Sequence, residues 1–430
     1  MQNRLDGKLV LLYTLLVLQV FIVMIYVIAT PPSEYTQLTP RNPVSFVRME
    51  PAYIPQKFEN RTSKPSISHP AYQIITSELK LKDTKTSSFF ITQNTTRCWK
   101  EGIIFNKSHT FSNKCHCQSG WHGPDCGQPE VVWRAIMASK QNIRLKPRKT
   151  SRRLIYTFSV QDYNSAIAEV IVEELHHVVD LFVICDFSGA EDNLQHKLNK
   201  GLLSNHQHKM LYINAAHKSR KPLRVISKYV WDKIINVVKN MKEDDIYVMS
   251  GPEQILNWRA LMFLKVYDGW PQPIGFRLRW SVFGFFWQHP SKTIITVGAC
   301  TVGCIYQSYR TNSIFLQREL GETNERDVLG LVIGDLNHYG GWYCNYCETP
   351  ANIMIALKKD GKPKEAKYAK NMDVLFVEDL IGTGVWFDDK MSLIRAYKTK
   401  ESYFAPETVI DNSFKFDWLV DNFYAKLDYY

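Results

Sequence analysis

Val178-Val-Asp-Leu-Phe-Val-Ile-Cys185 is the stretch that decides the fold class, because nearly every residue in it is apolar. A strand with one solvated face alternates apolar and polar residues, whereas a continuous apolar run is typical of a strand buried on both faces. Leu154–Val160 and Asp245–Met249 have a similar character, and Lys209–Ile213 is a shorter candidate. The sequence therefore predicts several buried strands of one sheet.

Amphipathic helices are expected between these strands. Ser165–His176 and Val225–Met241 both repeat apolar residues at helical spacing. Strand, helix and strand in this order predict an α/β domain over residues 154–430, with a mostly parallel sheet and helices on both faces. Ligands bind outside the carboxyl ends of strands in such sheets, so chemistry is expected in the loop Ser250-Gly-Pro-Glu253.

The N-terminal region predicts a membrane anchor. Residues 9–29 are 21 residues without a charge, and at about 1.5 Å per residue they span roughly 30 Å, the thickness of a bilayer core. Arg4 and Lys8 precede this run, so the positive-inside rule places residues 1–8 in the cytosol and the rest in the lumen. A cleaved signal peptide is the alternative, although its apolar run is usually shorter.

A flexible stem is expected over residues 30–97, because Pro, Ser, Thr and Asn dominate its composition. Three glycosylation sequons begin at Asn60, Asn94 and Asn106, as expected for a lumenal segment.

A cysteine module occupies residues 98–127. Its cysteines are Cys98, Cys115, Cys117 and Cys126, and the last part resembles the C-terminal half of an EGF-like repeat. Four cysteines allow three pairings, of which Cys98–Cys115 with Cys117–Cys126 is preferred. A zinc site is the alternative, but the lumenal context favours disulfides.

Basic residues give the chain a formal net charge of +11. The clusters at 144–153, 217–224 and 358–370 are interpreted as solvated loops, and residues 128–153 as a basic linker. No zinc-finger, recognition-module or P-loop pattern accompanies them, so nucleic acid is not an expected partner.

Several ordered blocks in the C-terminal two thirds of the chain resemble family 17 glycosyltransferases, the bisecting N-acetylglucosaminyltransferases of N-glycans. These blocks are Phe263–Trp270, Arg279–Trp287, Cys300–Val302, His338–Pro350, Thr383–Asp388 and Ala405-Pro406. The resemblance implies a nucleotide-sugar transferase (GT-A-like) fold, UDP-N-acetylglucosamine as donor and inverting β1,4 transfer to the β-linked mannose of N-glycoprotein acceptors. It also implies a single-pass type II protein of the Golgi membrane, able to associate with other Golgi transferases.

The chain departs from this family at its acidic cluster, D-D-x-D-E-I-P. Ser250 and Gly251 occupy the first aligned positions, and Glu253 is the one carboxylate kept there. Glu253 is therefore the candidate catalytic and metal-binding residue, although a lone Glu makes an Mn²⁺ or Mg²⁺ site doubtful. A second family block, aligned with Cys185–Ser188, keeps one acidic residue in this chain. That residue, Asp186, is a further catalytic candidate.

Other candidates come from the aromatic blocks. His338 is a possible base or acceptor contact, and the possible sugar-binding residues are Trp287, Trp342, Trp386 and Asp388. Each of them has a structural alternative, since most tryptophans in such domains belong to the core.

Cys344 and Cys347 form a C-x-x-C sequence that a redox protein could use. In a lumenal transferase a structural role is expected, with each cysteine paired elsewhere to Cys300, Cys304 or Cys185. Nine cysteines leave an odd one, and Cys185 is the expected free thiol.

Three functions remain open from the sequence. The first is an active Golgi transferase, and the second is an inactive relative that binds glycans or partner proteins. The third, an adhesion protein acting through the EGF-like module, agrees least with the extent of the transferase blocks.

Overall fold

The computed structural model describes residues 15–20, 78–93, 96–104, 114–139, 141–161, 164–188, 194–216, 223–309, 330–359, 373–388 and 390–425. The chain divides into two units, residues 1–67 and 68–430. The first is described only at 15–20, which are helical. Among the described residues, no helix has both the length and the apolar character needed to cross a membrane. The anchor expected at 9–29 falls mostly outside them.

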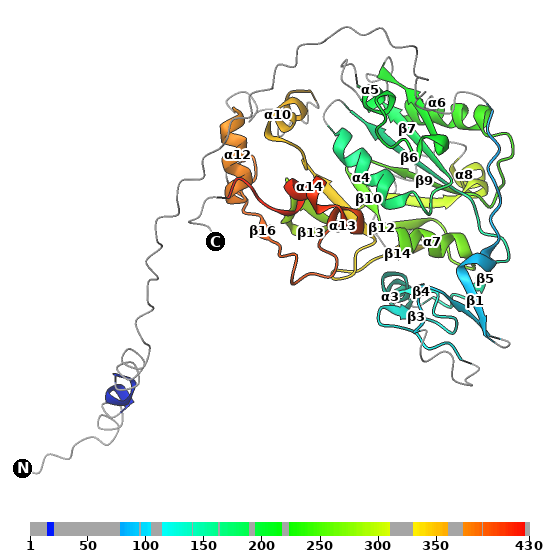
Figure 1. The fold of residues 1–430 in the computed structure, drawn as a ribbon, viewed down its shortest axis with the longest axis horizontal. Helices are drawn as coiled ribbons and strands as arrows, with labels where there is room; N and C mark the ends of the chain where they lie inside the picture. The colour runs from blue at the N-terminus through cyan, green and yellow to red at the C-terminus, as the bar shows by residue number, and fades with distance from the viewer. Residues whose placement is uncertain are drawn as a thin grey trace, which may run out of the picture. The chain divides into compact units, whose positions relative to one another are not determined.

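Ten described strands of the second unit form one sheet (Figure 1). Their order is β10-β15-β12-β13-β9-β6-β7-β8, with β14 also paired to β12 and β16 to β13. The strands are β6 (Leu154–Val160), β7 (Leu181–Asp186), β8 (Met210–Asn214), β9 (Ile246–Ser250), β10 (Gln254–Leu256), β12 (Ile274–Val282), β13 (Gly284–Thr301), β14 (Leu331–Ile333), β15 (Gly341–Asn345) and β16 (Ile394–Arg395). The four strands expected from apolar runs are thus β6, β7, β8 and β9.

The sheet is mixed, so the expectation of a mostly parallel sheet is confirmed only in part. Strands β8, β7, β6 and β9 are parallel, as expected. The long strand β13 then runs antiparallel to both β9 and β12, and β10 runs antiparallel to β15. This half of the sheet is itself mixed, since β12 runs parallel to β14 and β15. It has fewer continuous apolar runs, and β13 begins with a block of aromatic residues, so the sequence rule for parallel strands did not reveal it.

Side chains along the parallel strands alternate between two cores, because successive residues of a strand point to opposite faces. Phe182 and Ile184 of β7 join the larger core, which α4 (Ser165–Leu175) and α7 (Trp258–Val266) cover. Leu181 and Val183 join the second core under α6 (Leu223–Val237) and α8 (Val302–Tyr309). Helices therefore cover both faces, as predicted.

The C-terminal helices pack at the other end of the sheet. They are α10 (Pro350–Lys359), α12 (Val374–Thr383), α13 (Glu407–Asp411) and α14 (Ser413–Val420). Figure 1 shows α10, α12 and α14 gathered near β13 and β16, and their apolar residues join the larger core.

Part of the expected stem is folded onto the domain. Residues 86–89 form a 3-10 helix, η1 (Thr86–Phe89), and β1 (Phe90–Gln93) pairs with β2 (Thr96–Trp99). Leu81 is buried in the second core. The ordered chain thus begins before residue 97. The sequons at Asn60, Asn94 and Asn106 lie outside the described residues.

The cysteine module also packs on the domain. Disulfides join Cys98 to Cys115 and Cys117 to Cys126, the pairing favoured by the sequence. In the same region, β3 (Trp121–His122) pairs with β4 (Gln128–Pro129). Trp121 joins the larger core, and the Tyr267 hydroxyl donates to Asp125 over 2.7 Å. The module is therefore attached to the domain by buried contacts.

Residues 128–153, expected to be a basic linker, contain regular secondary structure. They form α3 (Glu130–Ser139), whose Val131 and Val132 are buried, and β5 (Lys146–Pro147), which pairs with β11 (Tyr267–Asp268). Arg153 is also buried, and its Nε donates to Asp245 Oδ1 over 2.7 Å. Its basic side chain is therefore an internal ion-pair partner.

Candidate functional site

The carboxyl ends of the parallel strands hold one candidate acid, Asp186, at the end of β7. Its side chain is buried, and both carboxylate oxygens have partners. Oδ1 accepts from the backbone N–H of Ser188 over 2.7 Å, and Oδ2 accepts from the Tyr212 hydroxyl. This geometry favours a role in holding the turn and the tyrosine over contact with a substrate.

Glu253 is fixed by a second segment of chain. Its backbone carbonyl accepts from the N–H of Cys344 over 2.9 Å, and its Oε1 accepts from the N–H of Tyr346 over 3.0 Å. β10 begins directly after Glu253 and pairs with β15, which leads into this segment. The sheet register therefore places the Glu253 carboxylate against the Cys344–Cys347 loop.

The loop is closed by a disulfide between Cys344 and Cys347 themselves. The expectation that each of them pairs elsewhere is wrong, because the close spacing already brings their Cα atoms to 5.4 Å, within disulfide range. Cys185, Cys300 and Cys304 are not part of a disulfide in the described structure. Cys185, the expected free thiol, is buried, and this raises its pKa to about 12.

Glu348 follows the disulfide and is the most perturbed acid near Glu253. Its side chain is 7% exposed. Burial, reinforced by the negative charge of Glu253, raises the pKa of Glu348 to about 8. Asn352 donates to its Oε2 over 3.2 Å, while no donor among the described residues reaches its Oε1. A buried carboxylic acid with one unpartnered oxygen beside a second carboxylate is typical of an acid–base site.

Glu348 also lines a small cavity in which half of the lining residues are aromatic, including Phe286, Trp418 and Tyr424. Aromatic faces are suitable surfaces for the apolar faces of sugar rings. A ligand in this cavity could therefore contact the side chain of Glu348, whose Oε1 has no partner among the described residues.

Lys197 supplies positive charge close to this pair. It lies in α5 (Leu194–Asn199), and its ammonium donates to the Ser165 hydroxyl at the start of α4 over 2.8 Å. The positive charge of Lys197 opposes the rise in the pKa of Glu348, which places it within electrostatic reach of that carboxyl. An ammonium beside a helix N-terminus is a favourable location for an anion.

The candidate tryptophans differ in accessibility. Trp287 and Trp342 are buried, and their indole N–H groups already donate to the carbonyls of Ile381 over 2.7 Å and Tyr403 over 3.0 Å. Both are thus held as core residues. Trp386 is half-buried, and its ring lies 5.9 Å from that of Tyr346 in the disulfide loop. The Trp386 ring therefore packs against the disulfide loop whose backbone binds Glu253.

His338 lies away from this group. It precedes β15, whereas the disulfide loop follows that strand, and four residue steps separate the strand ends by roughly 13 Å. Its Nδ1 is 3.1 Å from Asp335 Oδ1, in the turn before β15. Asp388 accepts from the backbone N–H groups of Lys390 and Met391 and so closes a local turn.

The residues do not fit the metal centre that an acidic cluster would form. The Ser250 hydroxyl donates to the Gln254 carbonyl over 3.1 Å, and Gly251 has no side chain. Within the described ranges, neither Glu253 nor Asp186 belongs to a group of three potential ligands close enough to share an ion. The one such group there lies elsewhere, at Glu173, His176 and His206.

Neither Glu348 nor Lys197 is among the residues that the sequence singles out. Glu348 does lie in the block His338–Pro350, so its position was marked, but its burial and its proximity to Glu253 depend on the pairing of β10 with β15. Lys197 belongs to a short helix without a motif. Only the folded chain brings them together.

Comparison with known proteins identifies the domain. The sequence model described as glycosyltransferase family 17 matches residues 139–318. The chain is 30% identical over 339 residues to human (Homo sapiens) β-1,4-mannosyl-glycoprotein 4-β-N-acetylglucosaminyltransferase, which covers 73% of this chain and 63% of the human protein. The mouse (Mus musculus) protein of the same name is 29% identical over 339 residues, 73% of this chain and 62% of its own. The chain thus spans less than two thirds of the length of these relatives.

Proposed function

The chain belongs to glycosyltransferase family 17, and we propose that it transfers N-acetylglucosamine from UDP-N-acetylglucosamine to the β-linked mannose of an N-glycan core, forming a β1,4 bond with inversion. Family membership implies a nucleotide-sugar donor and a glycan acceptor. The identity of both is proposed from the names of the human and mouse relatives.

The buried Glu348 carboxyl, within electrostatic reach of the Glu253 carboxylate, is the observation that carries an enzymatic function for this chain. An inverting transfer needs a base for the acceptor hydroxyl. In the proposed step the hydroxyl proton passes to Glu348 while the hydroxyl oxygen bonds to the anomeric carbon. The bond from that carbon to the diphosphate oxygen breaks, and its electron pair leaves with UDP. A base works best when its pKa is near the working pH, as it is for Glu348.

Lys197 is proposed to stabilise the departing diphosphate. Negative charge grows on that group as the glycosidic bond breaks, and a preorganised cation lowers the energy of this state. The ammonium of Lys197 is held at the start of α4 by Ser165. Because Glu253 and Asp186 share no metal centre among the described residues, we propose that this positive charge takes the place of a divalent cation.

The cellular setting is also part of the proposal. The charge-free run at 9–29 and the disulfide-bonded module support a type II protein with its domain in the Golgi lumen. N-glycoproteins would then be the acceptors. Association with other Golgi transferases is a further proposal from the resemblance.

The test is a transfer assay with the purified chain, UDP-N-acetylglucosamine and a biantennary N-glycan. Mass spectrometry should detect addition of one N-acetylhexosamine, and linkage analysis should place it at position 4 of the core β-mannose. Glycan binding without transfer would instead establish the inactive alternative. Transfer at another position would replace the proposed acceptor and leave the family assignment intact.

A further inference from the structure

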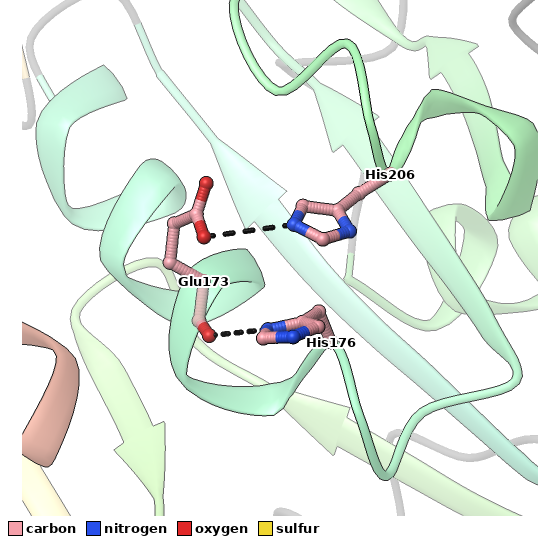
Figure 2. A group of neighbouring side chains, drawn as sticks. All are labelled: Glu173, His176 and His206. Atoms are coloured by element: carbon pink, nitrogen blue, oxygen red, sulfur yellow. Dashed lines mark hydrogen bonds and ion pairs between the residues drawn. The ribbon is translucent and has the colours of Figure 1, made fainter.

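Glu173, His176 and His206 form a cluster of potential metal ligands away from the candidate active site (Figure 2). One ligand atom from each residue lies within 4.8 Å of the other two. Glu173 lies in the last turn of α4, His176 caps the end of that helix, and His206 comes from the loop before η2 (Gln207–Lys209). The cluster is therefore at the amino-terminal edge of the parallel strands, opposite the end where Asp186 lies.

The helix brings the first two ligands together by its geometry. Residues three apart on an α-helix lie on one face, and Glu-x-x-His is a known way of presenting a carboxylate and an imidazole to one ion. Figure 2 shows both side chains on the side of α4 that faces His206. The His176 and His206 rings stack with centroids 4.5 Å apart, and Nε2 of His206 is 3.5 Å from Oε2 of Glu173.

The hydrogen bonds of His176 leave a ligand atom available. Its Nδ1 is 2.7 Å from the backbone carbonyl of Glu173. A carbonyl only accepts, so Nδ1 carries the proton, and a neutral ring then has its lone pair on Nε2. Such a bond from the second ring nitrogen to a carbonyl is how metal-binding histidines are usually oriented.

A positively charged side chain, Lys209, lies near the cluster and could repel a metal ion. Its ammonium donates to the carbonyls of His176 and Val179, the second over 3.1 Å, and is held there. His177 is turned to another partner, since its ring packs edge-on against Trp258 with the ring centroids 4.3 Å apart.

We propose that Glu173, His176 and His206 bind one Zn²⁺ or a similar borderline divalent cation. Two imidazoles and one carboxylate are a donor set suited to Zn²⁺, with water completing a tetrahedron at ligand distances of about 2.0–2.2 Å. Hard cations such as Mn²⁺ and Mg²⁺ prefer oxygen-rich sites and should bind weakly here. The ion would tie the end of α4 to the loop that precedes β8, so its role is structural.

Isothermal titration of the full chain with Zn²⁺ tests the proposal. Wild type should bind one ion at this site, and His176→Gln and His206→Gln should each weaken that binding by at least about 10-fold. His208→Gln is the matched control, because His208 is exposed and two residues from His206. His208→Gln should bind Zn²⁺ with the affinity of wild type. Unchanged affinity in both cluster variants would assign any bound zinc to another site and overturn the proposal.

Two further measurements keep the result clear. Co²⁺ should give the strong visible absorption of a tetrahedral centre, and this signal should be absent from His206→Gln. Glu173→Gln changes a partly exposed side chain without altering its size, so it serves if a histidine variant unfolds. Zn²⁺ should raise the melting temperature of wild type and of His208→Gln, but not of Glu173→Gln. A rise of equal size in all three would count against the cluster.

Discussion

The backbone N–H of Tyr346 donates to the Glu253 carboxylate over 3.0 Å, joining two segments that lie 93 residues apart. The backbone N–H of Cys344, two residues earlier, donates to the Glu253 carbonyl. The disulfide loop therefore holds Glu253 by both its main chain and its side chain. Glu348 follows the loop, and the negative charge of Glu253 contributes to raising the pKa of Glu348. The proposed base thus depends on a pairing between β10 and β15.

Glu348→Gln should lower kcat by about 10²–10⁴-fold, the usual contribution of a general base. The amide keeps the shape of the side chain but cannot take the acceptor's proton. Glu174→Gln is the control, because Glu174 is also buried and burial raises its pKa to about 7. Glu174 lies at the C-terminal end of α4, whereas Lys197 contacts the start of that helix. Steady-state kinetics on both variants check this, and similar losses in the two would argue against a specific role for Glu348.

The pH dependence of activity should follow Glu348. A base must be ionised to accept a proton, so kcat/KM should rise with pH to a midpoint near the pKa of Glu348, about 8. This rising limb should be absent from Glu348→Gln. If the variant keeps the same limb at reduced rate, another group controls the profile.

Stability should change with pH in the opposite direction. The folded-state pKa of Glu348 is raised from 4.5 to about 8, so between these values the folded chain holds a proton that the unfolded chain releases. The free energy of unfolding should therefore fall as pH rises through this window, and less steeply in Glu348→Gln. Urea unfolding at several pH values measures the difference in slope, which should be zero if Glu348 ionises normally.

The sequence predicted the parallel half of the sheet well, and the reason is physical. Strands buried on both faces need continuous apolar residues, so β6 and β7 stand out in the sequence. The mixed half was missed because the pairing of β12 with β13 contains register shifts, and the 18 residues of β13 mix aromatic, polar and charged side chains.

The candidate site was predicted only in part. Glu253 could be chosen because it is the acid left in a recognisable block. Its partner Glu348 could not, since the raised pKa comes from burial and from a neighbour distant in sequence. Likewise, Arg153 and Asp245 look like surface charges until folding buries both.

Lys197→Met should lower kcat by roughly 10–100-fold if its ammonium stabilises the leaving diphosphate. Lys200→Met removes the same charge from an exposed lysine that lines the same pocket as Lys197, and it should have much less effect. Kinetics with UDP-N-acetylglucosamine compare the two. Equal effects would mean that general basic charge in this region matters, and that the contact of Lys197 with Ser165 does not.

Transfer activity should persist in EDTA, because within the described ranges Glu253 belongs to no group of three potential ligands that could hold a catalytic cation. The assay compares initial rates with EDTA, with added Mn²⁺ and without either. A loss of activity in EDTA that Mn²⁺ restores would contradict the proposal. Restoration by Zn²⁺ alone would instead connect activity to the cluster at His176 and His206.

Asp245→Asn should destabilise the fold by about 3–5 kcal/mol, the usual cost of removing one member of a buried ion pair. The Arg153 and Asp245 side chains are 2% and 1% exposed, so the variant leaves a buried guanidinium without its anion. Asp244→Asn is the matched control. Asp244 pairs with Arg148 over 2.5 Å but is 44% exposed, so its loss should cost less than about 1 kcal/mol. Urea unfolding of the two variants should give clearly different midpoints. Equal midpoints would show that solvent or Asp83, 4.0 Å from Arg153, compensates the buried charge.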